Sequence, residues 1–521
     1  MRKSRDLACR FELAPQDCDG LITTIMRSGA VPTQKRKQIS ILLDTRDAAI
    51  GNHGLASGIR HEGEFAARNL KAIAEKAAAR QNPKGWTRFV EPLCAATPPE
   101  ARRWLRAFLG RKEVKGAIFR IESQTNSWSE PRAEIRLERL RLIAGRKQAS
   151  LAVATFTCPN GAADFFRFIA EICASAKLHL SAGSAALQAY RHFGALRAMH
   201  VSAFAPKLRS EMTVEDAFKT IARACLDQFL LNESAVRLGA DCEAVHQCRV
   251  ALRRLLASLR FFSGIVSGPE LDALRPELKQ VARYFQKPRD LDVLIGEVFP
   301  ASPPKEFVEI IEERRGSAYE ALGGALCSQE TANFFTRFLA WIEAGDWTQD
   351  PARDLSRKEK IVAFVERKLT NATEKFKSRC AALDHADEEE RHKIRIRAKN
   401  LRYSAEFFEG LVKSGKHRNA RRFHAFVGAL KDLQTILGRE NDAHMGRRFL
   451  ASLAQEMGQD RKAKKAPLIA IAALSGRIEG LSEPEYRRKI GKARRAFAEI
   501  KPFWDKIPLK KNLETAKKFE G

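Results

Sequence analysis

Two stretches of the sequence decide the fold: VHQCRVALRRLLASLRFF at residues 245–262 and RHKIRIRAKNLRYSAEFF at residues 391–408. In each stretch, apolar residues recur at helical spacing, which predicts an amphipathic helix. At an offset of 146 the two stretches carry related side chains at the same places: His246 and His392, Arg249 and Arg395, Arg253 and Lys399. A helix repeated with this spacing indicates a duplicated helical domain.

A second pair of segments repeats beside the first pair. LKQVARYFQKPRDLDV begins at Leu278 and LKDLQTILGRENDAHM at Leu430, so that Asp290 aligns with Asp442. Each unit therefore contains more than one repeated helix. The sequence predicts two pseudo-symmetric repeats of similar length that form one helical bundle.

The repeats occupy the second half of the chain. From Thr213, a typical N-cap residue, one helical pattern follows another with few strand signals. We expect an all-α domain at residues 205–515, with repeats at about 210–345 and 355–510.

Residues 1–200 follow a different pattern. Short β-rich runs recur, among them LACRFEL, QISILLDT, AIFRIES, AEIRLERLRLI and ASLAVATFTC. Helix-like segments follow from Ala162 (AADFFRFIAEIC) and from Ser184 (SAALQAYRHFGALRAM). This half is predicted to be an α+β domain that ends near residues 200–211.

The charge of the chain favours polyanionic partners. Lys and Arg number 92 against 63 Asp and Glu, a net charge of +29. Nucleic acid, anionic lipid and polyphosphate all attract such a surface, so net charge alone does not separate them. The ten cysteines are scattered without zinc or redox spacing, and no apolar run approaches a membrane span. We expect a cytoplasmic protein with reduced thiols and no membrane insertion.

The repeated helices predict where a polyanion binds. At about 100° per residue, His246, Arg249, Arg253 and Arg260 fall within an arc of about 60° on the first helix, and His392, Arg395, Lys399 and Arg402 follow the same face of the second. Leu252, Leu255, Leu259 and Phe262 gather on the opposite side of the first helix. Residues 391–431 hold 12 Lys or Arg and 2 acids, so this segment does not neutralise itself. The candidate polyanion-binding residues are His246, Arg249, Arg253, Arg260, Lys279, Arg283, Lys287, Arg289, His392, Arg395, Lys399, Arg402, Arg418, Arg421, Arg422 and Lys431.

These residue types suit phosphate. Arginine offers a planar fork to phosphate oxygens and lysine a point charge. A histidine with its ordinary pKa near 6.5 gains a proton beside phosphate, so we expect affinity to rise as pH falls. A basic helix face that is merely solvated is the alternative for any single stripe.

The two stretches resemble the CHAD domain, a histidine-containing helical domain of two four-helix repeats. The resemblance covers about residues 205–515, and the segment KNLRYSAEF is itself characteristic. The family is understood to bind inorganic polyphosphate along a basic central channel and to associate with polyphosphate granules. The resemblance implies that the basic residues named above line that channel.

The first half resembles a degenerate CYTH domain, the triphosphate tunnel metalloenzyme fold, in segments such as RFEL, LLDTRDAAI and GLASGIRHEG. Active members carry Glu-x-Glu-x-Lys, where this chain has Arg10, Glu12 and Ala14. A divalent metal needs several oxygen ligands. Glu12, Glu134 and Glu138 are the remaining strand carboxylates, and the polar face of a strand explains them equally well.

We therefore expect a protein without enzymatic activity, cofactor or bound metal, which binds inorganic polyphosphate and associates with polyphosphate granules. The alternatives are an active metal-dependent tripolyphosphatase, a nucleic-acid-binding protein and a scaffold. The basic arcs carry no aromatic residues for base stacking, which disfavours single-stranded nucleic acid.

Overall fold

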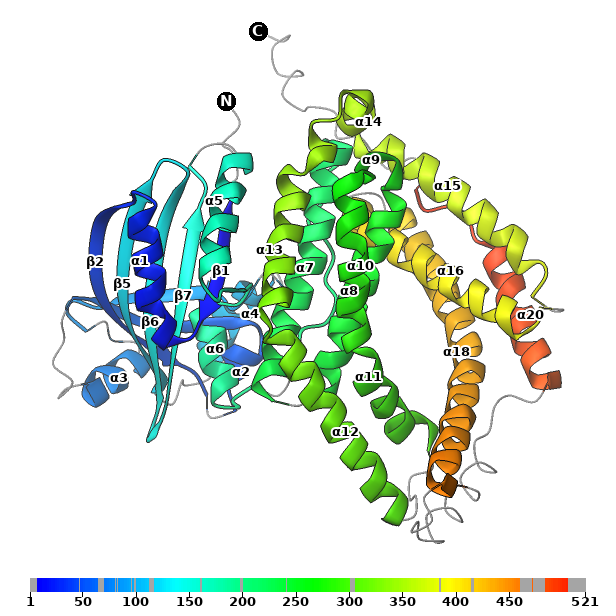
Figure 1. Ribbon diagram of the computed structural model, residues 1–521, viewed down its shortest axis with the longest axis horizontal. Coiled ribbons are helices and arrows are strands. Elements are labelled where there is room, and N and C mark those ends of the chain that lie inside the picture. The colour runs from blue at the N-terminus through cyan, green and yellow to red at the C-terminus, as the bar shows by residue number, and fades with distance from the viewer. Residues whose placement is uncertain are drawn as a thin grey trace.

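The structure is a computed structural model with two parts, a curved β-sheet domain and a helical domain (Figure 1). It describes residues 7–504 apart from 46, 64–69, 80, 82, 95, 98–99, 112–116, 160–161, 197–199, 240, 300–304, 384–385, 414–416, 460–470 and 472–482. The predicted fold class, α+β followed by all-α, is confirmed. The predicted ends of the second helix-like segment, at residue 199, and of the second repeat, at about 510, lie outside the described residues.

The first part is built on an antiparallel sheet with strand order β4-β3-β2-β5-β6-β7-β1-β8. The predicted β-rich runs lie in β1, β2, β5, β6 and β7, and β6 alternates buried and exposed positions as a half-covered strand does. The strands are β1 (Ala8–Leu13), β2 (Val31–Leu43), β3 (Leu55–Glu62), β4 (Thr87–Pro92), β5 (Ala117–Glu130), β6 (Ala133–Ala144), β7 (Lys147–Thr157) and β8 (His179–Leu180).

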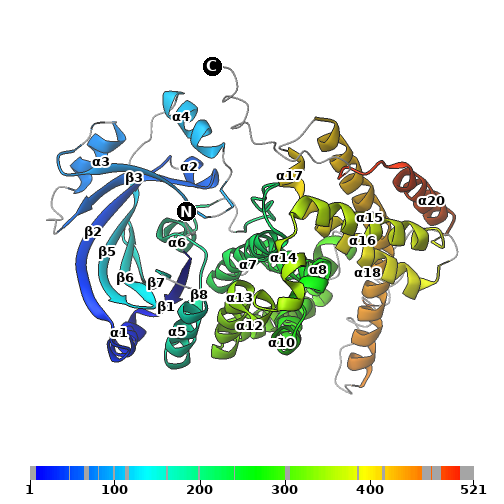
Figure 2. The same ribbon diagram turned by 90° about the horizontal axis from the view of Figure 1, so that it is seen from above.

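Helices cover both faces of this sheet. One face packs against α5, where the ring centroids of Phe156 and Phe168 lie 6.3 Å apart. The other face packs against α6, where Tyr190 meets Phe119. Figure 2 shows the curve of the sheet, with α6 at its open side. The helices of this part are α1 (Cys18–Arg27), α2 (Ala49–Asn52), α3 (Leu70–Ala78), α4 (Ala101–Arg111), α5 (Ala162–Ser175) and α6 (Ala185–His192).

The second part is helical throughout its described length. Thr213 begins it in a capping box, because its side chain accepts from the Asp216 amide at 3.1 Å while Asp216 accepts from the Thr213 amide. The predicted N-cap is therefore confirmed. The helices are α7 (Val214–Leu238), α8 (Cys242–Phe261), α9 (Ser263–Val266), α10 (Pro269–Tyr284), α11 (Gln286–Val293), α12 (Lys305–Leu326), α13 (Gln329–Ala344), α14 (Asp354–Lys358), α15 (Ile361–Cys380), α16 (Glu388–Phe407), α17 (Glu409–Lys413), α18 (His417–Gln459) and α20 (Glu483–Glu499).

Paired backbone bonds relate the two repeats by a pseudo-two-fold axis. The Val214 amide donates to the Glu359 carbonyl at 2.9 Å, and the Ile361 amide donates to the Met212 carbonyl at 3.1 Å. Val214 and Ile361 are the first residues of α7 and α15. The axis therefore places α7 onto α15 and α8 onto α16. The repeats differ at Phe285. In the first repeat the helix is interrupted there, between α10 and α11, whereas in the second repeat α18 continues as one helix of 43 residues.

The repeated Phe-Phe ends meet where the repeats join. Phe261 and Phe408 have ring centroids 5.4 Å apart, and Phe262 stacks on Phe364 at 5.3 Å. Leu252, Leu255, Leu259 and Phe262 are all buried, as the helical periodicity predicts. This aromatic junction holds the C-terminal ends of α8 and α16 together.

The two parts of the chain contact each other closely. Helix α5 packs against α13 (Figure 1), and the Gln329 side chain donates to the Cys173 carbonyl across this contact at 3.4 Å. The Arg191 guanidinium donates to the Ser234 hydroxyl at 2.5 Å. Over the described residues, none of the helices has the length and apolar character that crossing a membrane requires.

Candidate functional site

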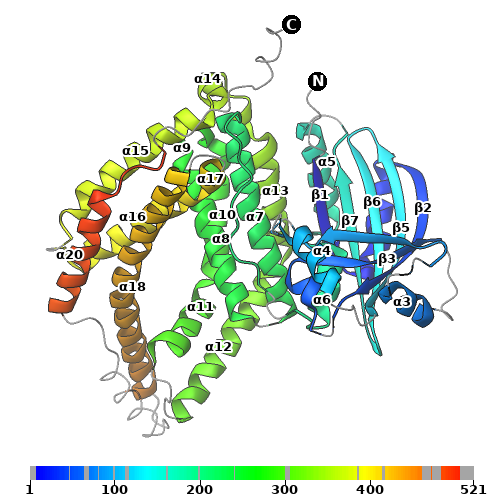
Figure 3. The same cartoon turned by 180° about the vertical axis from the view of Figure 1, so that it is seen from behind.

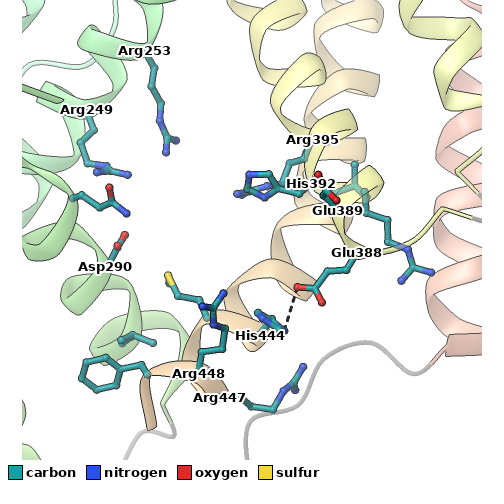
Figure 4. Close-up of a pocket in the computed structure, with 16 residues that line it drawn as sticks. Arg249, Arg253, Asp290, Glu388, Glu389, His392, Arg395, His444, Arg447 and Arg448 are labelled. Atoms are coloured by element: carbon teal, nitrogen blue, oxygen red, sulfur yellow. Dashed lines mark ion pairs between the residues drawn. The ribbon is translucent and has the colours of Figure 1, made fainter. Parts of the chain in front are cut away.

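A cavity of about 990 Å³ lies between the two repeats, and we call it the central cavity (Figure 4). One wall comes from α8 and α11, the other from α16, and α18 supplies the remaining side. Its lining consists of Arg249, Arg253, Gln286, Asp290, Leu294, Glu388, Glu389, Arg391, His392, Arg395, Leu437, His444, Met445, Arg447, Arg448 and Phe449.

The sequence positions these groups through helix geometry. Arg249 and Arg253 are four residues apart on α8 and therefore share one face of it, while Leu252 and Leu255 are buried on another. Helices α8 and α16 approach at their C-terminal ends and diverge toward their N-terminal ends (Figure 1). The space that opens between them receives the basic face of each helix.

Positive charge exceeds negative charge in this lining. Three carboxylates, Asp290, Glu388 and Glu389, face six arginines. Glu388 lies 3.2 Å from His444 Nδ1, an ion pair when the imidazole is protonated, and Glu389 pairs with Lys393 at 2.7 Å. Two of the three carboxylates are therefore engaged by groups other than the arginines. The arginines are Arg249, Arg253, Arg391, Arg395, Arg447 and Arg448.

The repeated aspartates face the repeated arginines. Burial, followed by the charge of Arg253, lowers the pKa of Arg249 to about 10, and the charge of Asp290 opposes the shift. Burial likewise lowers the pKa of Arg395, and Asp442 opposes that shift. The alignment of Asp290 with Asp442 thus has a structural meaning, since each aspartate offsets part of the charge of one repeated arginine.

Lys399 lies where the charges of both repeats meet. Burial, followed by the charges of Arg395 and Arg253, lowers its pKa to about 7, and the charge of Asp442 opposes the shift. Arg253 belongs to the first repeat, and Lys399 to the second. A cation that loses its proton this readily sits in a strongly positive field, which a bound anion would relieve.

His246 does not titrate as the sequence predicts. Burial, followed by the charge of Arg289, lowers its pKa to about 4, so the imidazole is neutral at physiological pH. The expectation of an ordinary histidine pKa is wrong at this position because the side chain is largely buried among arginines. His392, by contrast, is exposed on the cavity wall.

Several other predicted residues lie close to the central cavity. Lys279 and Arg283 line a groove of about 330 Å³ that shares Arg249 and Arg253 with the cavity. Lys287 is exposed on α11. Arg289 pairs with Glu297 at 3.1 Å, so an acid within the protein already engages it.

The remaining predicted residues lie elsewhere. Arg402 donates to Glu406 at 2.8 Å and to Gln434 at 3.1 Å. Arg260 lines a different groove, because α16 crosses between it and the cavity.

Four predicted residues of α18 lie toward its N-terminal end, where Arg422 donates to the Pro502 carbonyl at 3.3 Å. At 1.5 Å per residue, Arg418 is about 44 Å along the helix from Arg447, too far to share its cavity. The four are Arg418, Arg421, Arg422 and Lys431.

Sequence reasoning missed part of the lining. His444, Arg447 and Arg448 share one face of α18 at spacings of three and four residues. The helical periodicity that singled out α8 could have found them. The duplication gives no signal for them, because the first repeat carries no basic residue at the matching positions. Arg391 also lines the cavity, with its guanidinium 4.1 Å from the centre of the Tyr486 ring.

The carboxylates of the sheet domain do not fit a divalent-metal site. Glu12 accepts from the Ser181 hydroxyl at 2.6 Å, from the Gln188 amide and from Arg237 at 3.1 Å. Its oxygens are therefore already bonded. Glu134 is exposed and accepts from Ser129, and Glu138 faces Arg136 at 3.5 Å. Within the part of the chain that the structure describes, there is no group of three or more His, Cys, Asp or Glu side chains that could hold a metal.

Fold and cavity together define a duplicated helical domain with a basic cavity between its repeats. Residues 220–451 match the CHAD domain family, so the helical half of the chain contains a CHAD domain. The crystal structure of the CHAD domain from the plant Ricinus communis is similar, with 26% sequence identity, 56% of this chain and 96% of that chain covered, and a TM-score of 0.46. A comparison with curated proteins gave no match. The resemblance of the sheet domain to CYTH stays a prediction.

Proposed function

We propose that the central cavity binds inorganic polyphosphate. The observation that carries this proposal is the convergence of Arg249 and Arg253 from one repeat with His392 and Arg395 from the other. The CHAD family, to which the helical half matches, is associated with polyphosphate binding. A chain of phosphates supplies the closely spaced negative charge that such a cavity lacks.

Residues that line the cavity and residues beside it have separate roles in this proposal, and Lys399, Lys279 and Arg283 belong to the second group. Arg249 and Arg395 offer planar forks to phosphate oxygens from opposite walls. Lys399 takes up a proton when the anion arrives, because phosphate charge raises a pKa that starts near 7. Lys279 and Arg283 extend the path for the chain along the adjoining groove.

The composition of the lining disfavours single-stranded nucleic acid. Such ligands bind through bases stacked on aromatic rings. The phenyl ring of the lining is Phe449, which packs against the apolar cluster around Leu291 and Leu450. Arginines and histidines make up most of the remainder, and these contact phosphate regardless of base. Duplex DNA bound through its phosphates is the competitor to test.

A binding measurement with matched variants tests the proposal. We expect Arg249→Ala with Arg395→Ala to weaken binding of fluorescent polyphosphate about 100-fold, since each charge-assisted contact contributes roughly 1.5–3 kcal/mol. Arg146→Ala with Lys147→Ala removes the same charge from an exposed turn of the sheet domain and serves as the control. Equal affinities for the cavity variant and the control would overturn the proposal. So would duplex DNA that displaces the probe more readily than polyphosphate at equal phosphate concentration and salt.

We further propose that the protein associates with polyphosphate granules in the cytoplasm, and that the sheet domain acts there as a structural partner. The bonds that Ser181, Gln188 and Arg237 make to Glu12 support this role. Imaging of the tagged full chain and of the Arg249→Ala, Arg395→Ala variant against stained polyphosphate tests the association. Phosphate release from tripolyphosphate with Mg²⁺ or Mn²⁺ that Glu12→Gln abolishes would contradict the structural role.

A further inference from the structure

A second basic groove lies on the side of α16 that faces away from the central cavity, and we call it the α15–α16 groove. It has a volume of about 720 Å³ and lies among α8, α15 and α16 (Figure 3). Its described lining residues include no carboxylate. The basic residues that line it are Arg260, Lys368, Lys375, Arg379, Lys393 and Arg397.

This groove faces away from the site already described. On a helix of about 100° per residue, Arg397 and Asn400 project about 170° and about 110° from the mean direction of His392 and Arg395. Among the six cations, Lys393 forms an ion pair with Glu389 at 2.7 Å. Lys375 and Arg379 are exposed. Burial, followed by the charges of Arg367 and Lys375, lowers the pKa of Lys368, as expected where positive charges crowd together.

The matching groove of the first repeat is filled by the chain itself. The pseudo-two-fold axis places α7 and α8 onto α15 and α16. Between α7 and α8, the Asn232 side chain donates to the Val201 carbonyl at 2.9 Å and accepts from the Val201 amide at 2.8 Å. The Arg254 guanidinium donates to the Phe204 carbonyl at 2.9 Å. The extended linker from the sheet domain therefore lies in this groove.

Asn232, which bonds to the linker, is replaced by a cation in the second repeat, whereas Arg254, which also bonds to it, is replaced by Asn400. Gln228, Asn232 and Gln247 line the filled groove, and Gln228 bonds to Gln247 at 3.1 Å. By the symmetry that pairs Val214 with Ile361 and His246 with His392, their counterparts are Lys375, Arg379 and Lys393. Gln228 and Asn232 are fully buried, whereas Lys375 and Arg379 are exposed. The second groove thus has Lys375, Arg379 and Lys393 in place of three neutral amides, and the neutral Asn400 in place of Arg254.

We propose that the α15–α16 groove binds a second extended polyanion, a condensed phosphate chain, where the first repeat holds its own linker. The choice of phosphate over an acidic peptide follows from the substitution of Asn232 by Arg379. An amide side chain can satisfy both the N–H and the C=O of a peptide, whereas a guanidinium donates only and suits phosphate oxygens. The inference shares its ligand class with the proposed function but uses different residues.

Calorimetric titration with tripolyphosphate, at fixed pH and salt, tests the proposal on the full chain. The groove variant is Lys375→Gln with Arg379→Asn, which installs the residues of the first repeat at two exposed positions. We expect the unaltered chain to bind two molecules and the groove variant to bind one. The cavity variant, Arg249→Ala with Arg395→Ala, should also bind one. The turn variant, Arg146→Ala with Lys147→Ala, should keep two.

The outcomes separate this inference from the proposed function. A groove variant that retains two sites overturns the inference. A cavity variant that retains two sites overturns the proposed function. It leaves the inference about the groove supported if the groove variant has lost one site.

Two competitors then identify the ligand of the groove. Polyglutamate that displaces tripolyphosphate from the cavity variant more readily than polyphosphate does, at equal charge, overturns the assignment to phosphate. ATP that binds the cavity variant tenfold more tightly than tripolyphosphate assigns the groove to nucleotides and likewise overturns it.

Discussion

The contact between the two domains and the central cavity both gather charged side chains, but they balance charge in opposite ways. At the contact, Arg237 lies 2.7 Å from Glu233 and 3.1 Å from Glu12, so two carboxylates enclose one guanidinium. In the central cavity, three carboxylates face six arginines. The comparison teaches that charges paired at the contact hold the two domains together, whereas an excess of arginines over carboxylates in a cavity favours an anionic ligand.

The largest expected effect comes from breaking the paired region. Arg237→Met leaves Glu12 and Glu233 close together and unneutralised, and we expect it to lower the free energy of unfolding by about 3 kcal/mol. Urea denaturation followed by circular dichroism measures this change. Polyphosphate affinity should stay within twofold of the unaltered chain, because the central cavity is untouched.

An exposed ion pair provides the control for that variant. Arg139 pairs with Asp19 at 2.5 Å, and the Asp19 side chain is 90% exposed. Arg139→Met should lower the free energy of unfolding by less than about 1 kcal/mol, as for surface ion pairs generally. Equal losses in the two variants would contradict the distinction between the two regions.

Increasing the imbalance in the cavity should strengthen binding. Asp290 and Asp442 oppose the charges of Arg249 and Arg395, and they also repel an incoming phosphate chain. We expect Asp290→Asn with Asp442→Asn to raise polyphosphate affinity about tenfold, or roughly 1.4 kcal/mol. Glu100→Gln with Glu134→Gln, two exposed positions of the sheet domain, is the matched control. Weaker binding by the aspartate variant than by this control would refute the electrostatic account of the cavity.

A smaller effect concerns pH. Because Lys399 has a pKa of about 7 in the free protein and phosphate raises it, binding takes up a proton and weakens as pH rises. If the bound lysine stays protonated, affinity falls about threefold between pH 6.5 and 7.5. Anisotropy titrations at several pH values measure the slope. The Lys399→Met variant should lose this part of the slope, and an unchanged slope would exclude Lys399 as its source.

Local sequence was sufficient to predict the duplicated helices and their faces. Leu252, Leu255 and Leu259 are buried because helical periodicity places them opposite Arg249 and Arg253, as expected. The two-residue period likewise located β6 and its neighbours. These features depend on spacing within one element, which the sequence displays directly.

The rest depends on how the elements cross. Arg260 and Arg402 share the basic arcs of their helices, yet the crossing of α8 and α16 and the pairing with Glu406 keep them out of the cavity. The low pKa of His246 results from burial beside Arg289, which no local pattern reveals. The linker residues Val201 and Phe204 bond to α7 and α8 of the first repeat, and the α15–α16 groove of the second repeat has no such segment among its described lining residues. No local sequence pattern predicts this difference between the repeats.

A crystal structure of the full chain with tripolyphosphate tests the central claim most directly. The account predicts phosphate groups between Arg249 and Arg395, within hydrogen-bonding distance of guanidinium groups from both repeats. Phosphate bound only in the interior of the sheet domain, or only along α18 near Arg418, with none between the two arginines, would contradict it.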